Sequence, residues 1–110
     1  MKAKQDNEDI YKAIYEVVRS IPKGRVSSYG AVAQALGLKS GARMVARAMS
    51  HNSTGERAFP AQRVVNSAGV LSGDNGRRQQ LLEAEGVQVK DGKVVDFKTV
   101  FWDPLKEMEV

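Results

Sequence analysis

Apolar side chains recur at intervals of three and four residues along the first part of the chain, which places them on one face of a helix. The residues of this stripe are Ile10, Ile14, Val17, Val18 and Ile21. The acids Asp6, Glu8 and Asp9 lie near the beginning of the stretch, where the helix dipole favours negative charge. Pro22 and Gly24 follow the last apolar position and end the helix.

Two shorter helices are predicted next, because capping and stopping residues bracket two short apolar stretches. Ser27 or Ser28 can cap the first helix, and Gly37 ends it. Ser40 can cap the second helix, over residues 41–52. Their inner faces are Val32, Ala33 and Leu36 in the first helix and Val45, Ala48 and Met49 in the second. Two short helices joined by a tight, glycine-containing turn predict a helix-turn-helix.

The segment after these helices predicts mixed structure. Residues 60–65, "PAQRVV", favour a short strand or an extended segment, although a guanidinium stands in the middle of it. Residues 66–76 are rich in turn formers, and residues 77–86 predict a last helix.

A hairpin is predicted at residues 87–97, with Asp91 and Gly92 at its turn. A helix-turn-helix followed by a hairpin is the winged-helix arrangement, so we expect a mainly α fold with a small β component. The expected core spans about residues 8–97, and residues 98–110 form a tail. In that tail we expect Phe101, Trp102 and Leu105 to pack back on the body.

Composition adds the class of protein to this picture. The chain has 110 residues, of which 42% are hydrophobic and 27% charged, as in a single globular domain. It has no run of about 20 apolar residues and no apolar signal segment, so we expect a cytoplasmic protein without a membrane partner, and a monomer by default. It also has no cysteine, which excludes disulfides and thiol chemistry, and we predict no metal and no cofactor.

Charge is distributed unevenly along the chain. Residues 19–63 contain one acid, Glu56, and eight basic residues, whereas acids outnumber lysines after Glu83. A basic segment of this kind is typical of a protein that binds a polyanion, because neutralising phosphates releases condensed counterions. A solvated basic face without a partner is the alternative.

The second short helix has few side chains with which to read bases. Its outer positions are expected to be Gly41, Ala42, Met44, Ala46 and Ser50, with only Arg43 and Arg47 among them. Small residues permit close approach but carry few hydrogen-bond donors, which favours sequence-insensitive binding in the minor groove. The alternative is that the small residues only allow tight packing against the neighbouring helix.

Two residues near the helix-turn-helix require a reason for their position. Arg43 lies at the N-terminal end of its helix, where the dipole disfavours a cation, and a nearby phosphate or base stack is one such reason. Tyr29 begins the preceding helix and is exposed if Val32 and Leu36 face inward. A tyrosine there can press on a phosphate or stack on a base.

Taken together, these stretches resemble the DNA-binding C-terminal domain of the O6-alkylguanine-DNA alkyltransferases. The resemblance covers roughly residues 8–90 and preserves the order and spacing of the motifs. The matching stretches are "IPKGRVSSYGAVAQALG", "ARMVARAM", Asn52, "PAQRVVNSAG" and "LLEAEGV". The resemblance implies a winged helix-turn-helix of the alkyltransferase C-terminal type.

The chain departs from that family at the active-site motif. Where the alkyltransferases have Pro-Cys-His-Arg-Val, this chain has Pro60, Ala61, Gln62, Arg63 and Val64. A methyl group is no nucleophile, and an amide is no base near neutral pH. Glu85 takes the place of the family's supporting carboxylate, as a relic or as a structural hydrogen-bonding residue. This loss resembles the alkyltransferase-like proteins, which bind alkylated guanine without repairing it, so we expect no enzyme activity.

The resemblance also implies roles for residues that remain. DNA containing O6-alkylguanine would be bound in the minor groove by Gly41, Ala42, Ala46 and Arg47, while Arg43 fills the space of a flipped nucleotide and Tyr29 pushes its phosphate. Asn52 and Arg63 would be structural residues: Asn52 would bridge the second short helix and the segment 60–65, and Arg63 would anchor that segment by hydrogen bonds to carbonyls or an acid, with direct contact to DNA as the alternative. The lesion pocket would consist of Tyr29, Pro60, Ala61, Val64, Ser72, Gly73 and Asp74. Nucleotide excision repair proteins are the partners that this resemblance implies, and the protein would be associated with the nucleoid when bound to DNA.

Two other functions remain open at this point. A winged-helix regulator would show base-sequence preference and indifference to alkylation. An enzyme with another nucleophile could use Ser67 or Ser72, with His51 as the sole histidine.

Overall fold

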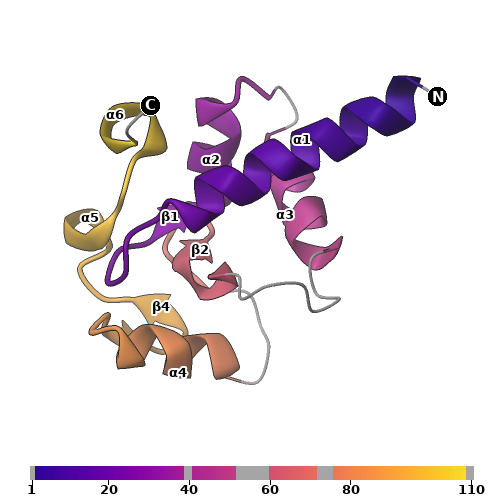
Figure 1. Cartoon of the computed structure of the whole chain (residues 1–110). Helices are drawn as coiled ribbons and strands as arrows, with labels where there is room; N and C mark the ends of the chain where they lie inside the picture. The colour runs from indigo at the N-terminus through magenta and orange to yellow at the C-terminus, as the bar shows by residue number, and fades with distance from the viewer. Residues whose placement is uncertain (1, 39–40, 52–59, 72–75, 109–110) are drawn as a thin grey trace.

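The computed structural model describes residues 2–38, 41–51, 60–71 and 76–108 (Figure 1). Within these ranges, helices predominate and the strands form two small two-stranded sheets. The prediction of a mainly α fold with a small β component is confirmed.

The first helix, α1 (Lys2–Arg19), crosses the helix-turn-helix and packs on both of its helices (Figure 1). Its predicted stripe is confirmed, because Ile14, Val17 and Val18 are buried in the main core. No helix in the described ranges is long and apolar enough to cross a membrane.

The helix-turn-helix consists of α2 (Tyr29–Ala35) and α3 (Gly41–His51). Ser28 is the residue that caps α2, since its Oγ accepts a hydrogen bond from the Ala31 N–H at 3.0 Å. Gly37 ends the helix in the left-handed region at a φ of +69°, and the Leu38 N–H donates to the Ala33 carbonyl at 3.0 Å. The predicted cap at Ser40 lies outside the described residues.

Two short parallel strands, β1 (Ser27–Ser28) and β2 (Val64–Val65), separate two apolar clusters. Successive side chains of a strand point to opposite faces. Val64 accordingly joins the main core under the helices, and Val65 joins a second cluster with Leu82.

The second cluster is closed by α4 (Arg77–Ala84) and by the hairpin of β3 (Val89–Lys90) and β4 (Lys93–Val94). Asp91 and Gly92 both have positive φ, of 54° and 75°, as a two-residue hairpin turn requires. The predicted last helix and hairpin are therefore both confirmed.

The tail forms two one-turn helices, α5 (Phe97–Val100) and α6 (Pro104–Glu107). Trp102 is 4% exposed in the main core, which confirms that the tail packs back. The prediction for Leu105 is wrong, because this side chain is 56% exposed. In so short a helix only one face is covered: Pro104 is buried and Leu105 faces outward.

The segment 60–65 is only partly extended. Residues Ala61–Arg63 form a 3₁₀ turn, η2, in which the Pro60 carbonyl accepts from the Arg63 N–H at 3.0 Å. Only Val64 and Val65 are a strand. The expectation of a strand or extended segment is thus wrong for Ala61–Arg63 and holds only for Val64 and Val65, and the contacts of Gln62 and Arg63 give the reason.

Candidate nucleic-acid interface

The outer face of α3 is exposed over one helical turn and a half. Ala42, Arg43, Ala46 and Arg47 are all solvent-exposed, and their spacing of one, four and five residues places them side by side. The face therefore consists of a row of two methyl groups beside a row of two cations, a surface that a polyanion can approach closely.

Gly41 belongs to the packing between the helices. A Cβ at Gly41 would lie 3.3 Å from the Cβ of Ala33 in α2, closer than most carbon contacts. Each interpretation of the small residues therefore applies to different positions. Gly41 allows α2 and α3 to pack closely, whereas Ala42 and Ala46 lie on the surface.

Tyr29 is the first residue of α2 and follows its cap directly. Its side chain is half-buried and packs against the main core, so it is less exposed than the sequence predicts. The core therefore holds part of this side chain, and the position of the ring depends on where α2 begins.

The guanidinium in the segment 60–65 is part of a nearly buried ion pair. Arg63 and Glu85 side chains are 18% and 9% exposed, with 2.9 Å between Nη2 and Oε2. The Arg63 Nε–H also donates to Glu85, and its Nη1 donates to the Ile21 carbonyl at 2.8 Å. Arg63 is therefore an internal anchor: it joins η2 to Glu85 at the end of α4 and to Ile21, two residues beyond the end of α1.

Glu85 accepts hydrogen bonds from three parts of the chain. Besides Arg63, it accepts from the Gln62 side chain at 2.8 Å and from the Gly24 N–H at 3.1 Å. Burial alone would raise the pKa of this carboxyl, but the hydrogen bonds from Arg63, Gly24 and Gln62, with the positive charge of Arg63, lower it below its usual 4.5. Glu85 therefore remains ionised and has a structural role.

These contacts leave little chemistry at the motif. Ala61 contributes only a methyl group, and the Gln62 amide nitrogen is directed to Glu85. The Glu85 carboxylate is neutralised by Arg63 and is hydrogen-bonded. It therefore has no free position at which to accept a proton, as the carboxylate of a catalytic relay must. The described residues also contain no group of three His, Asp or Glu that could hold a metal ion.

Several predicted site residues can be placed and others cannot. Pro60 and Ala61 are half-buried, whereas Val64 is 1% exposed, so its side chain belongs to the core and only its backbone can contribute to a pocket. Asn52, Ser72, Gly73 and Asp74 lie outside the described residues.

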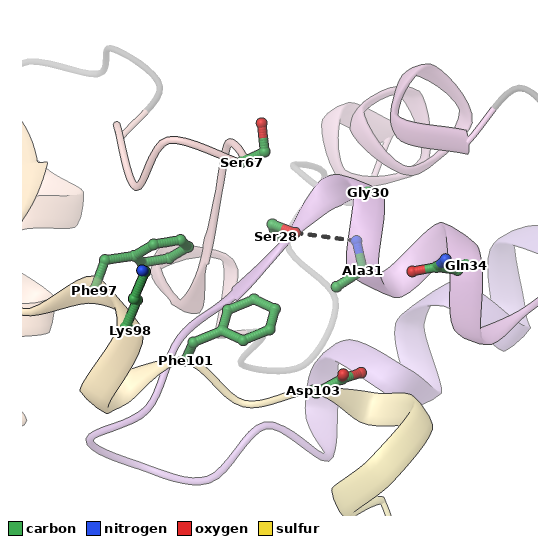
Figure 2. Close-up of a pocket in the computed structure, with 9 residues that line it drawn as sticks. All are labelled: Ser28, Gly30, Ala31, Gln34, Ser67, Phe97, Lys98, Phe101 and Asp103. Atoms are coloured by element: carbon green, nitrogen blue, oxygen red, sulfur yellow. Dashed lines mark hydrogen bonds between the residues drawn. The ribbon is translucent and has the colours of Figure 1, made fainter.

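A groove that the sequence did not predict lies on the other side of α2. It has a volume of about 500 Å³, with α2 on one side and the tail on the other (Figure 2). The Phe97 and Phe101 rings meet edge to face at 5.4 Å between centroids. A sequence signal existed, because aromatic residues four apart lie on one face of a helix. The described lining residues are Ser28, Gly30, Ala31, Gln34, Ser67, Phe97, Lys98, Phe101 and Asp103.

Comparison with known families gives a direct match. The model of the family described as the 6-O-methylguanine DNA methyltransferase DNA-binding domain matches residues 9–87, most of the chain. The chain belongs to this family. Since the chain contains no cysteine, it has no cysteine nucleophile for alkyl transfer.

Relatives within the family include proteins named for base flipping. A DNA base-flipping protein of Vibrio parahaemolyticus serotype O3:K6 (strain AQ3810) is 37% identical over 94 residues, which is 83% of this chain and 93% of that protein. Alkyltransferase-like protein 1 of Schizosaccharomyces pombe (strain 972) is 35% identical over 96 residues, 83% of this chain and 88% of that protein.

A solved structure extends this similarity to three dimensions. The crystal structure of S. pombe Atl1 in complex with damaged DNA containing O6-carboxymethylguanine superposes with a TM-score of 0.79 at 34% identity. The match covers 88% of this chain and 97% of that one. The expected alkyltransferase-type fold is therefore confirmed.

Proposed function

We propose that this protein recognises O6-alkylguanine in duplex DNA by flipping the damaged nucleotide, and that it transfers no alkyl group. The observation that carries the proposal is the exposed surface of Ala42, Arg43, Ala46 and Arg47 in a chain whose active-site motif has Ala61 at the position of the nucleophile. The relatives named for base flipping and the Atl1 complex with damaged DNA support it.

In this proposal α3 docks in the minor groove. Its two exposed methyl groups permit close approach without reading base sequence, and Arg47 neutralises phosphate charge. Arg43 fills the space that the flipped nucleotide leaves, which offsets part of the few kcal/mol that unstacking costs. Tyr29, whose side chain packs against the main core, presses on the neighbouring phosphate.

The motif then holds the base without reacting with it. Ala61 leaves room for the O6 substituent, and Gln62 bound to Glu85 supplies no base to activate a nucleophile. A lesion that is bound and left unchanged must be handed on, so we propose that the complex marks the site for nucleotide excision repair.

The decisive experiment compares two duplexes of the same sequence, one with O6-methylguanine and one with guanine. We expect the protein to bind the alkylated duplex at least about ten-fold more tightly, a difference of about 1.4 kcal/mol. Equal binding of the two duplexes contradicts the proposal.

Two further measurements separate the alternatives. A winged-helix regulator would distinguish undamaged duplexes by sequence, which a set of unrelated sequences would reveal. An enzyme with another nucleophile would move a radiolabelled alkyl group from the DNA to the protein or to solvent, whereas we expect all the label to remain on the DNA.

A further inference from the structure

The last part of the chain that the structure describes, residues 97–108, forms a strap beside Val26, the residue that precedes β1. The Val26 N–H donates to the Val100 carbonyl at 3.0 Å, and the Trp102 N–H donates to the Val26 carbonyl at 2.7 Å. Val26 and Phe101 thereby pair in parallel. The strap is thus bridged to the residue just before β1, three positions before α2 begins.

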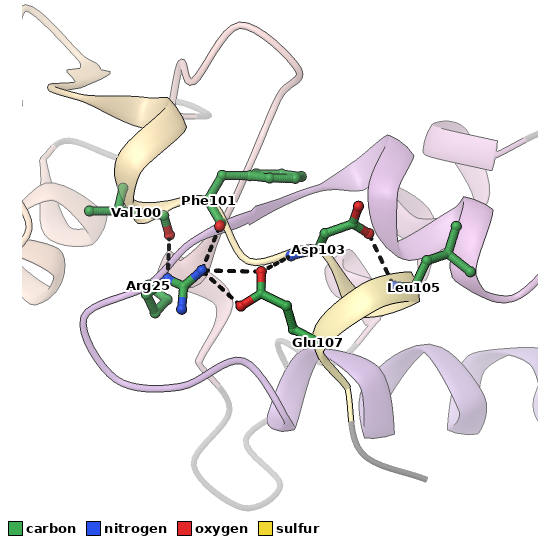
Figure 3. A network of polar contacts seen from close by, with 6 residues as sticks. All are labelled: Arg25, Val100, Phe101, Asp103, Leu105 and Glu107. Carbon is green, nitrogen blue, oxygen red and sulfur yellow. Dashed lines mark hydrogen bonds and ion pairs between the residues drawn. The ribbon is translucent and has the colours of Figure 1, made fainter.

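One side chain fastens this strap at three places. The Arg25 Nε–H donates to the Val100 carbonyl at 3.0 Å, and Nη2 donates to the Phe101 carbonyl at 2.6 Å (Figure 3). The same Nη2 lies 3.2 Å from the Glu107 carboxylate. Arg25 therefore holds both the extended part of the strap and its terminal helix α6.

The strap also has its own internal order. Asp103 caps α6 by accepting from the Leu105 N–H at 3.0 Å, and Glu107 accepts from the Asp103 N–H at 3.0 Å. The Asp103 N–H and the Arg25 guanidinium lower the pKa of the Glu107 carboxyl. In this arrangement α6 packs directly against α2.

The position of α2 depends on these contacts. A seven-residue helix is not stable by itself, so its orientation is set by what packs around it. One side of α2 packs on α3 and the other on α6, while β1 leads into its first residue, Tyr29. The strap is hydrogen-bonded to Val26, just before β1, and packs on the helix that begins with Tyr29.

We infer that Arg25 is a positioning residue for lesion recognition, which acts through the strap on α2 and so on Tyr29. This inference rests on the proposed function. Arg25 does not read the lesion; it fixes the strand and the helix that place the Tyr29 ring against the DNA. Loss of the fastening lets α2 shift, and the discrimination between alkylated and undamaged DNA decreases.

The first test compares Arg25→Ala with Lys23→Ala, an exposed residue two positions away with the same charge. Both variants lose one positive charge, so both weaken binding of undamaged DNA to a similar extent. We expect only Arg25→Ala to reduce the ratio of affinities for alkylated and undamaged duplex, by roughly five-fold.

A second variant, Glu107→Gln, separates the effect of charge on DNA binding from the effect of the strap on discrimination. It removes a negative charge, so binding of undamaged DNA stays equal or becomes tighter. The strap is fastened less firmly, however, and we expect the affinity ratio to fall by about two-fold. This mild change also covers the case in which Arg25→Ala does not fold.

A third measurement asks whether Arg25 acts through Tyr29. In a double-mutant cycle with Tyr29→Phe, the losses in the affinity ratio should be less than additive, because both changes affect one contact.

Trp102, the only tryptophan in the chain, reports the state of the strap, and its emission should move to longer wavelength in Arg25→Ala.

The outcomes are separable. If the wild-type protein binds both duplexes equally, the proposed function and this inference both fall. If the wild type discriminates and folded Arg25→Ala discriminates equally well, only this inference falls. Additive losses in the cycle also overturn it, because Arg25 would then act independently of Tyr29.

Discussion

At the scale of single residues, the internal pair of Arg63 and Glu85 explains why a guanidinium stands beside core valines. The family resemblance implies that Arg63 anchors its segment, and a buried cation does require acceptors. The sequence does not predict that Arg63 and Gln62 turn toward the same carboxylate 22 and 23 positions away. That shared partner is a long-range contact, and it converts the expected extended segment into the turn η2.

Replacement of Arg63 by alanine should be among the most damaging single changes. It leaves Glu85 buried without its main partner, and we expect a loss of about 3 kcal/mol in the free energy of unfolding. Urea titration followed by circular dichroism measures it. Lys106→Ala, at an exposed position, should change the value by less than about 0.5 kcal/mol.

The same pair makes stability depend on pH. The pKa of Glu85 is lower in the folded than in the unfolded chain, so its contribution is complete above about pH 4.5 and is lost as the pH falls through the lower, folded value. Unfolding titrations between pH 6 and pH 3 should show this decline. A Glu85→Gln variant with an equally steep decline would contradict the assignment.

Arg43 is the residue on which the flipping proposal depends most directly. Its side chain is exposed, so we expect Arg43→Ala to keep the wild-type unfolding free energy and to bind alkylated duplex about ten-fold more weakly. Fluorescence anisotropy with the labelled duplex measures this. An unchanged affinity would remove the role assigned to Arg43, and Lys106→Ala is the control for charge.

At the scale of elements, local sequence was sufficient wherever a helix or turn is made by its own residues. The cap at Ser28, the stop at Gly37 and the hairpin turn at Asp91 and Gly92 all follow from local chemistry. The closeness of Gly41 to Ala33 could not be predicted in this way, because it depends on how two helices approach.

The cap of α2 can be tested separately from its packing. Ser28→Ala removes the acceptor for the Ala31 N–H and should cost about 1 kcal/mol of unfolding free energy. Ser20→Ala, at an exposed position past the end of α1, should cost less. Because Tyr29 follows the cap, Ser28→Ala should also weaken binding of alkylated duplex; full retention would show that the cap does not influence Tyr29.

At the scale of the whole molecule, the strap connects the two apolar clusters. Trp102 lies in the main core, while Phe97 and Val100 pack against the second cluster. The sequence predicts that the tail packs back but not where, since its partners at Val26 and Arg25 lie about 75 positions earlier.

This connection predicts one cooperative unfolding transition. Trp102 fluorescence and far-ultraviolet circular dichroism should give coincident urea curves, because the strap cannot leave without exposing part of both clusters. A fluorescence transition at lower urea would show that the strap detaches first.

The division of Val64 and Val65 between two clusters limits how this motif can vary. Adding or deleting one residue just before β2 would exchange the two valines between faces and would also move Arg63 away from Glu85. Substitution at Ala61 disturbs neither feature. New pocket shapes can therefore arise by exchange of side chains at constant length, whereas insertions and deletions in this segment would disrupt the fold.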